Sequence, residues 1–205
     1  MNLLFTNIGR RNYLLDFSRS IDKLNLFVSD SDELAAGVLE DDIKVIRTPK
    51  VSTDYQYYVD FLLEKCISNN IDIVFPLLDY ELPIISKNKD KFLSKNIFVC
   101  ISDFDFINNT LNKLKTYQNY KHLINFPKTY TKQEEIPPNI KILKKKIIGS
   151  ASIGIEFYKD KSTISNFCEG EDILQEQIIG DEYGMDILND LEGNFVHASL
   201  EKNSL

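Results

Sequence analysis

Several residue types are scarce in this sequence of 205 residues, and each scarcity narrows the choice of function. The three cysteines, Cys66, Cys100 and Cys168, lie far apart and form no Cys-x-x-Cys pair, which argues against a zinc site or a disulfide framework. We therefore expect reduced thiols in a cytoplasmic protein. The two histidines, His122 and His197, have no cysteine or serine at catalytic spacing, so we expect structural or surface roles for them.

Long apolar runs are also missing. No stretch approaches the roughly 18 apolar residues of a membrane-spanning helix, so we expect no membrane span. The first 15 residues carry a basic pair after their short apolar run and not before it, which is not the pattern of a signal peptide. Basic charge is in the minority, because 24 Lys and Arg face 31 Asp and Glu and give a formal net charge of −7. This balance argues against nucleic acid as a partner, since phosphate neutralisation supplies most of such affinity.

What remains is an ordinary globular composition, with 43% hydrophobic and 27% charged residues. At about 150 residues per domain, the chain corresponds to one large domain or to one domain and part of a second. A chain of this length buries enough surface to fold without disulfides or a structural metal.

Strand and helix patterns alternate over residues 1–102. Apolar runs predict strands at 3–6, 26–29, 44–46, 71–76 and 97–101. Helical periodicity predicts helices at 10–20, 55–69 and 81–92, the first with Tyr13, Leu14, Phe17 and Ile21 on one face. This alternation predicts right-handed βαβ units and a parallel sheet, and therefore an α/β, Rossmann-like domain.

Charged residues and a glycine follow two of the predicted strands. Gly9, Arg10 and Arg11 come after the first strand, and Asp79 and Glu81 come after the fourth. Ligands of parallel sheets bind beyond the carboxyl ends of the strands, so these residues are candidates for substrate binding. The alternatives are a helix start with exposed arginines in the first case and caps of the following helix in the second.

The pattern changes after residue 102. Residues 103–125 are mostly helical in pattern, and short β-like runs follow at 140–143, 153–158, 173–179 and 194–199. A basic run, Lys144–Lys146, precedes a glycine/serine loop at 149–154. Small residues let backbone N–H groups approach a phosphate, and lysines supply charge. A simple hairpin turn is the alternative, and the P-loop pattern is absent.

Two further segments carry residues suited to a nucleotide. Glu176 and Glu182 flank a glycine turn at Gly180, where two strands with solvated acids would be the plainer interpretation. Lys113 lies on a predicted helix and taken alone would be an ordinary surface charge. The order of these segments along the chain is more specific than any one of them.

In this order the segments resemble those of the ATP-grasp superfamily, particularly the ligases similar to the large subunit of carbamoyl-phosphate synthase. The resembling segments are residues 3–15, 71–92, 112–116, 126–130, 145–149 and 175–183. The resemblance implies a Rossmann-like pre-ATP-grasp domain over 1–102 and the small, N-terminal part of an ATP-grasp domain over 103–205, with the C-terminal catalytic part absent.

The resemblance also implies an ATP site. Its residues would be Lys113, Lys145, Gly149, Ser150, Ser152, Glu176, Gln177, Ile178, Ile179 and Glu182. The two lysines would contact phosphates, and the loop from Gly149 to Ser152 would close over them. Glu176 and the backbone of the three following residues would bind adenine, and Glu182 would bind the ribose. The three adjacent lysines leave the register of the loop lysine open by one residue.

The activity that the resemblance implies is ligation of a carboxylate to an amine or a thiol through an acylphosphate, with ATP and Mg²⁺. In the family the magnesium ligands lie further along the chain, so we expect them outside this one, and no catalytic residue is assigned. A homo-oligomer or a partner chain would then complete the domain. The alternative is a non-catalytic relative that serves as a nucleotide-binding or interaction module. A nicotinamide-dependent dehydrogenase is disfavoured, because the first turn has a single glycine.

Overall fold

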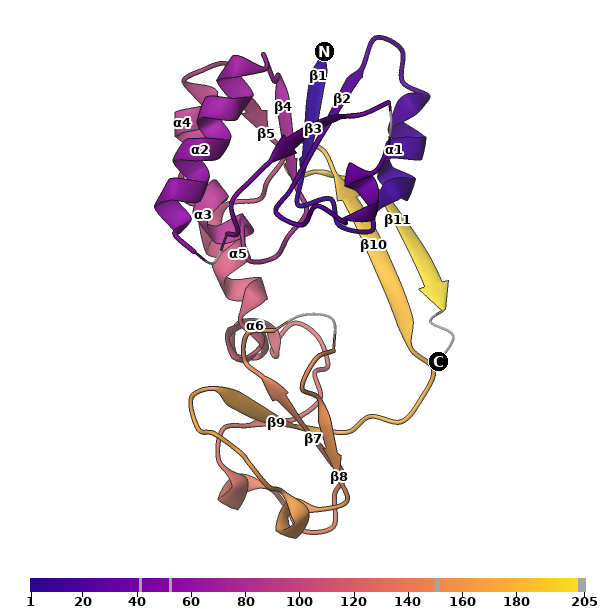
Figure 1. The fold of residues 1–205 in the computed structure, drawn as a ribbon. Helices are drawn as coiled ribbons and strands as arrows, with labels where there is room; N and C mark the ends of the chain where they lie inside the picture. Colours follow the sequence, from indigo (N-terminus) through magenta and orange to yellow (C-terminus); the bar gives the residue numbers. More distant parts are fainter. Residues whose placement is uncertain (41, 52, 150–151, 203–205) are drawn as a thin grey trace. The chain divides into compact units, whose positions relative to one another are not determined.

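The computed structural model describes residues 1–40, 42–51, 53–149 and 152–202, which form two compact units (Figure 1). Unit 1 comprises residues 1–122 and 148–151, and unit 2 comprises residues 123–147 and 152–205. The sequence placed a boundary at residue 102. The two helices that follow, α5 (Phe104–Leu111) and α6 (Lys113–Tyr120), fall within unit 1, where α5 packs against α3 (Leu82–Lys87).

Unit 1 is built on a parallel sheet of five strands in the order β3-β2-β1-β4-β5. The strands are β1 (Asn2–Thr6), β2 (Asn25–Asp30), β3 (Lys44–Arg47), β4 (Ile73–Pro76) and β5 (Phe98–Val99). Consecutive residues such as Leu4 and Phe5 are both buried, because helices cover both faces. The predicted Rossmann-like sheet is thereby confirmed.

The two faces of the sheet carry different helices and separate cores (Figure 1). On one face lie α1 (Asn12–Arg19) and the short 3-10 helix η1 (Ala36–Val38). On the other lie α2 (Tyr55–Ser68), α3 and α4 (Lys89–Leu93). The predicted helix at 81–92 is thus divided in two at Asn88, whose side-chain Nδ2 donates to Ile84 O at 2.8 Å.

The buried face of α1 is not the predicted one. Leu15 is fully buried in the core with Phe5 and Val28. Tyr13 and Phe17 are 55% and 73% exposed, so the face assigned to the core is wrong by about one residue's rotation around the helix.

A buried carboxylate joins the carboxyl ends of β1 and β4. Glu81 is 0% exposed. Its two oxygens accept hydrogen bonds of 2.5–3.0 Å from Thr6 Oγ1, Asn7 Nδ2, Tyr58 Oη and the backbone N–H groups of Leu77 and Leu78. Burial raises the pKa of the Glu81 carboxyl, and the donors partly oppose that shift. The strand order reverses between β1 and β4, so this side chain fixes the sheet at the place where such folds bind ligands.

Unit 2 contains a four-stranded sheet in the order β6-β9-β7-β8. Its strands are β6 (Thr129–Tyr130), β7 (Ile142–Lys146), β8 (Glu156–Tyr158) and β9 (Asp172–Glu176), with short 3-10 helices at Gln133–Glu135 and Lys161–Thr163. β9 pairs antiparallel with both β6 and β7. Ile136, Ile142 and Leu174 form a small core on one side of it.

The rest of unit 2 is a two-stranded antiparallel sheet of β10 (Tyr183–Asn189) and β11 (Phe195–Lys202). Residues paired across the strands share a face, so Met185 with Leu200 and Ile187 with Ala198 make one side apolar. Met185, Ile187 and Leu200 are 59%, 60% and 63% exposed. We call this side, with Val196, the hairpin apolar face.

We predict that Glu81→Ala lowers the free energy of unfolding by about 2–4 kcal/mol, because it leaves several buried donors without an acceptor. Urea denaturation measures this loss. Glu64→Ala is the control, since Glu64 is 70% exposed on α2 and its loss should change stability by less than about 0.5 kcal/mol. Equal midpoints for the two variants would contradict the structural role of Glu81.

Candidate functional site

In unit 1 the structure joins two residues that were predicted to bind phosphate. Lys113 stands in the first turn of α6, where Asn112 Oδ1 caps the helix by accepting from Lys115 N–H at 2.9 Å. Lys113 Nζ donates to Gly149 O at 2.6 Å. Partial burial lowers the pKa of the Lys113 ammonium group, and the charge of Asp79 opposes that shift. The lysine therefore already holds one end of the glycine/serine loop.

The turn after β1 forms a second part of the site in unit 1. Gly9 has a φ of 55°, a left-handed conformation that suits glycine, and its N–H donates to Asp30 Oδ2 at 2.9 Å. Arg11 Nη1 approaches Asn7 O at 3.5 Å. Arg10 is exposed, so at this turn the group presented to solvent is its guanidinium.

The two acids after β4 have different environments. Asp79 is exposed and can meet a ligand at this edge. Glu81 is fully buried with both oxygens occupied, so the prediction that it lines a substrate cleft is wrong. Glu81 directly precedes Leu82, the first residue of a helix that packs on the sheet. This position favours burial of the carboxylate, and the prediction did not take it into account.

In unit 2 the strand β7 sends its three lysines to two faces of the sheet. Lys144 is 5% exposed and pairs with Glu156 at 2.8 Å. Lys146, on the same face, pairs with Asp172 at 2.9 Å. The hydrogen bond to Glu156 raises the pKa of Lys144, and those to Asp172 and then Glu171 raise the pKa of Lys146.

Lys145 points to the other face, because successive residues of a strand alternate. Its Nζ donates to Gln175 Oε1 at 2.7 Å. Lys144 and Lys146 are engaged by carboxylates within unit 2, whereas Lys145 contacts the uncharged amide of Gln175. This geometry favours the original register over its two neighbours.

The loop after β7 connects two antiparallel strands, with Lys144 opposite Glu156. Ser152 and Gly154 have φ values of 56° and 76°. Ser150 lies outside the described residues. The loop is therefore a hairpin connection, as the alternative interpretation held, and phosphate binding by it stays a prediction.

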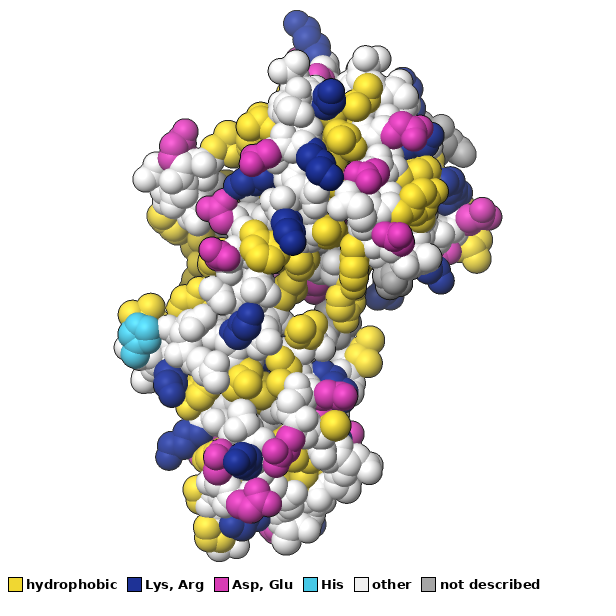
Figure 2. Space-filling model, turned by 90° about the vertical axis from the view of Figure 1, so that its left-hand side faces the viewer, with side chains coloured by type: hydrophobic (Ala, Val, Ile, Leu, Met, Phe, Trp, Pro, Cys, Tyr) yellow, Lys and Arg dark blue, Asp and Glu magenta, His cyan; other side chains and the backbone are white. Residues whose placement is uncertain are grey.

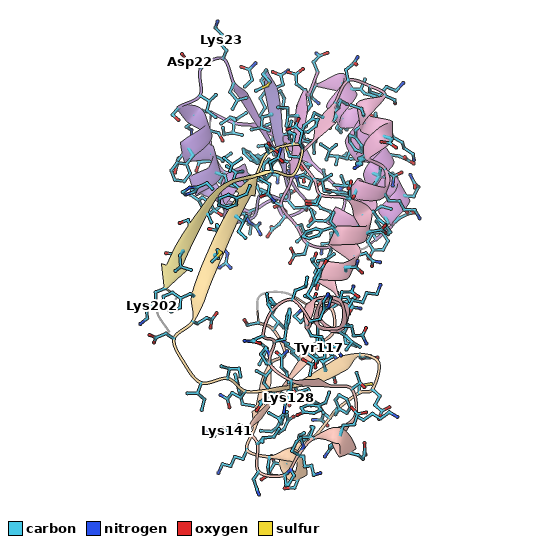
Figure 3. The ribbon with its side chains drawn as sticks, turned by 180° about the vertical axis from the view of Figure 1, so that it is seen from behind. Asp22, Lys23, Tyr117, Lys128, Lys141 and Lys202 are labelled. Carbon is cyan, nitrogen blue, oxygen red and sulfur yellow. The ribbon has the colours of Figure 1, made fainter. Side chains whose placement is uncertain are left out.

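The segment after β9 is the predicted adenine and ribose site. Glu176 N–H donates to Lys128 O and Gln177 N–H to Lys141 O, both at 2.9 Å (Figure 3 labels both lysines). These two N–H groups are used inside unit 2 and do not face a base. The side chains of Ile178 and Ile179 are 66% and 74% exposed.

Glu176 lies apart from Lys145. Glu176 pairs with Ile142, and Lys145 pairs with Ile173, which puts Glu176 and Lys145 on opposite faces of the sheet. Glu182 is exposed in the connection before β10. Sequence reasoning missed Gln175, a buried amide beside Lys145. The alternation of side chains along a strand could have identified it, because Gln175 lies two residues after Ile173 and therefore on the same face of β9.

Other features do not add to the site. A hollow of about 280 Å³ at the amino ends of β4 and β5 is lined by Cys66, Asp72, Lys95 and neighbouring residues, at the edge of the sheet away from the candidate residues. Burial raises the pKa of Cys66 to about 12. Figure 2 shows basic and acidic side chains intermixed over the face it displays.

Within the described ranges, no group of three or more His, Cys, Asp or Glu residues is placed to hold a metal ion. Among the same residues, no helix is long and apolar enough to cross a membrane.

Solved structures of several other proteins share the fold of this chain. An L-amino acid ligase from Bacillus licheniformis is 18% identical with a TM-score of 0.66, over 99% of this chain and 53% of that chain. N5-carboxyaminoimidazole ribonucleotide synthetase from Thermotoga maritima is 13% identical with a TM-score of 0.65, over 97% of this chain and 51% of that chain. The biotin carboxylase domain of 2-oxoglutarate carboxylase from Hydrogenobacter thermophilus, in complex with MgADP, is 12% identical with a TM-score of 0.61, over 91% and 46%.

These neighbours have the fold of ATP-grasp proteins, and this chain spans about half the length of the structures it matches. Family models agree in both halves: the PylC-like N-terminal domain matches residues 3–100, and an ATP-grasp domain matches residues 110–199. The chain belongs to the ATP-grasp superfamily, as its motifs predicted. No curated protein matches its sequence.

We predict that Lys144→Met lowers the free energy of unfolding by about 1–3 kcal/mol, because it leaves Glu156 without its buried partner. Lys202→Met is the control, because the ion pair of Lys202 with Asp181 is more than half exposed on both sides and contributes little. Thermal or urea denaturation gives the comparison. A larger loss in Lys202→Met would contradict the assignment of Lys144 as the structural lysine.

Proposed function

We propose that this chain is the ATP-binding portion of a ligase that joins a carboxylate to an amine or a thiol through an acylphosphate. The observation that best supports the proposal is the arrangement of Lys145, turned away from the two ion-paired lysines beside it, in a domain that matches the ATP-grasp family. Charge-assisted hydrogen bonds from lysine suit the oxygens of a triphosphate.

The residues proposed to bind the nucleotide are described unit by unit. Lys113 exchanges its hydrogen bond with Gly149 O for one with a phosphate oxygen, which releases the glycine/serine loop to cover the phosphates. In unit 2 the exposed side chains of Ile178 and Ile179 give adenine an apolar surface, and Glu182 accepts from ribose hydroxyls. Glu176 remains the candidate for the adenine amino group.

The carboxylate substrate binds at the carboxyl edge of the parallel sheet. Arg10 and Asp79 are exposed there, with Arg11 half-buried behind the turn. A guanidinium suits the carboxylate that is to be phosphorylated. Bound Mg²⁺ would help neutralise the phosphates, and we expect its ligands outside this chain.

The second half of the catalytic domain comes from further polypeptide, either continuous with this chain or from a partner chain. The half-length match to the solved structures supports this. So does the hairpin apolar face, because two strands alone are only marginally stable and an exposed apolar surface favours association.

A second candidate is a non-catalytic nucleotide-binding module. The half-length match and the missing metal-binding cluster among the described residues favour it. Turnover of ATP distinguishes the two, since a module binds ATP without consuming it in any assembly.

We predict that calorimetric titration shows ATP binding to the chain and that Lys145→Met weakens it about tenfold, as expected for the loss of a hydrogen bond to a charged group. Lys146→Met should bind ATP as the wild-type chain does, because Lys146 forms ion pairs with Asp172 and Glu171. The absence of ATP binding, or equal effects of the two variants, would count against the site.

We predict that the purified chain self-associates through the hairpin apolar face and that Ile187→Lys shifts it to monomer. Sedimentation velocity at several protein concentrations measures the change. Ser199→Lys is the control, because Ser199 pairs with Asp186 on the opposite side of the hairpin. A wild-type chain that is monomeric throughout would contradict the prediction.

A further inference from the structure

A chain of three hydrogen bonds crosses the four-stranded sheet of unit 2 and ends at Lys145. Lys145 Nζ donates to Gln175 Oε1 at 2.7 Å, and Gln175 Nε2 donates to Thr129 Oγ1 at 2.8 Å. Thr129 Oγ1 in turn donates to Pro127 O at 3.1 Å. The chain joins strands β7, β9 and β6 to Pro127, two residues before the start of β6.

The chemistry at its two ends fixes the direction of every bond. An ammonium group can only donate, so the Gln175 atom that faces Lys145 must be the carbonyl oxygen. The amide NH₂ then faces Thr129, which must accept. The hydroxyl proton of Thr129 therefore goes to the carbonyl of Pro127, which can only accept. This arrangement of donors and acceptors is the only one that satisfies all three bonds.

The amide of Gln175 is also held mechanically. Gln175 is 8% exposed and lies on β9, between β6 and β7. It pairs with Thr129 on one side and with Leu143 on the other. Rotation of the amide would break both side-chain hydrogen bonds in a site with little water, which is costly.

Gln175 differs from the partners of the neighbouring lysines in charge. Glu156 and Asp172 hold Lys144 and Lys146 with a negative charge that offsets the lysine's own. An uncharged amide directs an ammonium group through a hydrogen bond of similar length and contributes no negative charge. Gln175 therefore directs Lys145 without itself placing a negative charge beside it.

We infer that Gln175, oriented by Thr129, is a positioning residue that aims Lys145 at an anionic ligand, for which the nucleotide phosphates are the class that fits. This inference rests on the proposed function for the identity of the ligand. The orientation of Lys145 itself does not depend on it.

The test compares Gln175→Leu and Thr129→Val with the wild-type chain in two measurements. NMR relaxation of the Lys145 side chain, observed in protein labelled at the lysine ε-carbon, reports how tightly the lysine is held. Calorimetric titration with ATP reports the affinity. We expect increased mobility of Lys145 and about tenfold weaker ATP binding in Gln175→Leu, with a smaller change of the same kind in Thr129→Val.

Gln133→Leu is the matched control, because the Gln133 amide donates to Lys161 O elsewhere in unit 2, and it should change neither measurement. Gln175→Glu distinguishes the orientation of Lys145 from the charge beside it. This variant should keep Lys145 ordered and still weaken ATP binding, because it adds a negative charge next to the lysine. Unchanged mobility of Lys145 in folded Gln175→Leu would overturn the positioning role. Absence of ATP binding in the wild-type chain, with the mobility change present, would contradict the proposed function alone.

Discussion

The ligand-facing edge of unit 1 depends on one buried carboxylate that is itself closed to ligands. Glu81 accepts from Thr6 at the end of β1, from Asn7 in the turn that follows and from Tyr58 on α2. It also holds the backbone of its own turn through Leu77 and Leu78. A single side chain therefore links the turns after β1 and β4 by hydrogen bonds. Arg10 and Asp79 are exposed at this edge of the sheet, which the hydrogen bonds of the buried Glu81 hold in place.

In unit 2 the alternation of side chains along β7 separates three adjacent lysines. Three adjacent lysines on β7 would repel one another on one surface, but alternate residues point to opposite faces. Lys144 and Lys146 are satisfied by carboxylates, and Lys145 is directed by an amide. Sequence position within the strand thus separates structural lysines from the one proposed to bind nucleotide.

Much of the fold followed from the sequence because its signals are local. Short apolar runs such as residues 3–6 indicated strands of a parallel sheet, and the motif order indicated the family. The buried face of α1 was wrong, because Phe17 is apolar yet 73% exposed, and only the packing of Leu15 on the sheet determines the rotation. Composition and periodicity do not determine which way α1 is rotated about its axis.

The candidate site was less predictable, because it depends on contacts between distant residues. Glu81 has the sequence signature of a substrate ligand, and its burial arises from Thr6 and Tyr58, which lie 75 and 23 residues away. Gln175 contacts Lys145 across 30 residues, so strand alternation could give its face but not its partner. The roles of the remaining nucleotide residues come from family motifs and await measurement.

The central claim is that this half-length chain holds the nucleotide-binding part of an ATP-grasp ligase. Amide hydrogen exchange with and without ATP tests it most directly, since it maps contact to segments without requiring turnover. The account predicts slower exchange over residues 143–149 and 176–182, with the hairpin of β10 and β11 unchanged. Exchange that is unaffected by ATP in both segments, or protection confined to other parts of the chain, would contradict it.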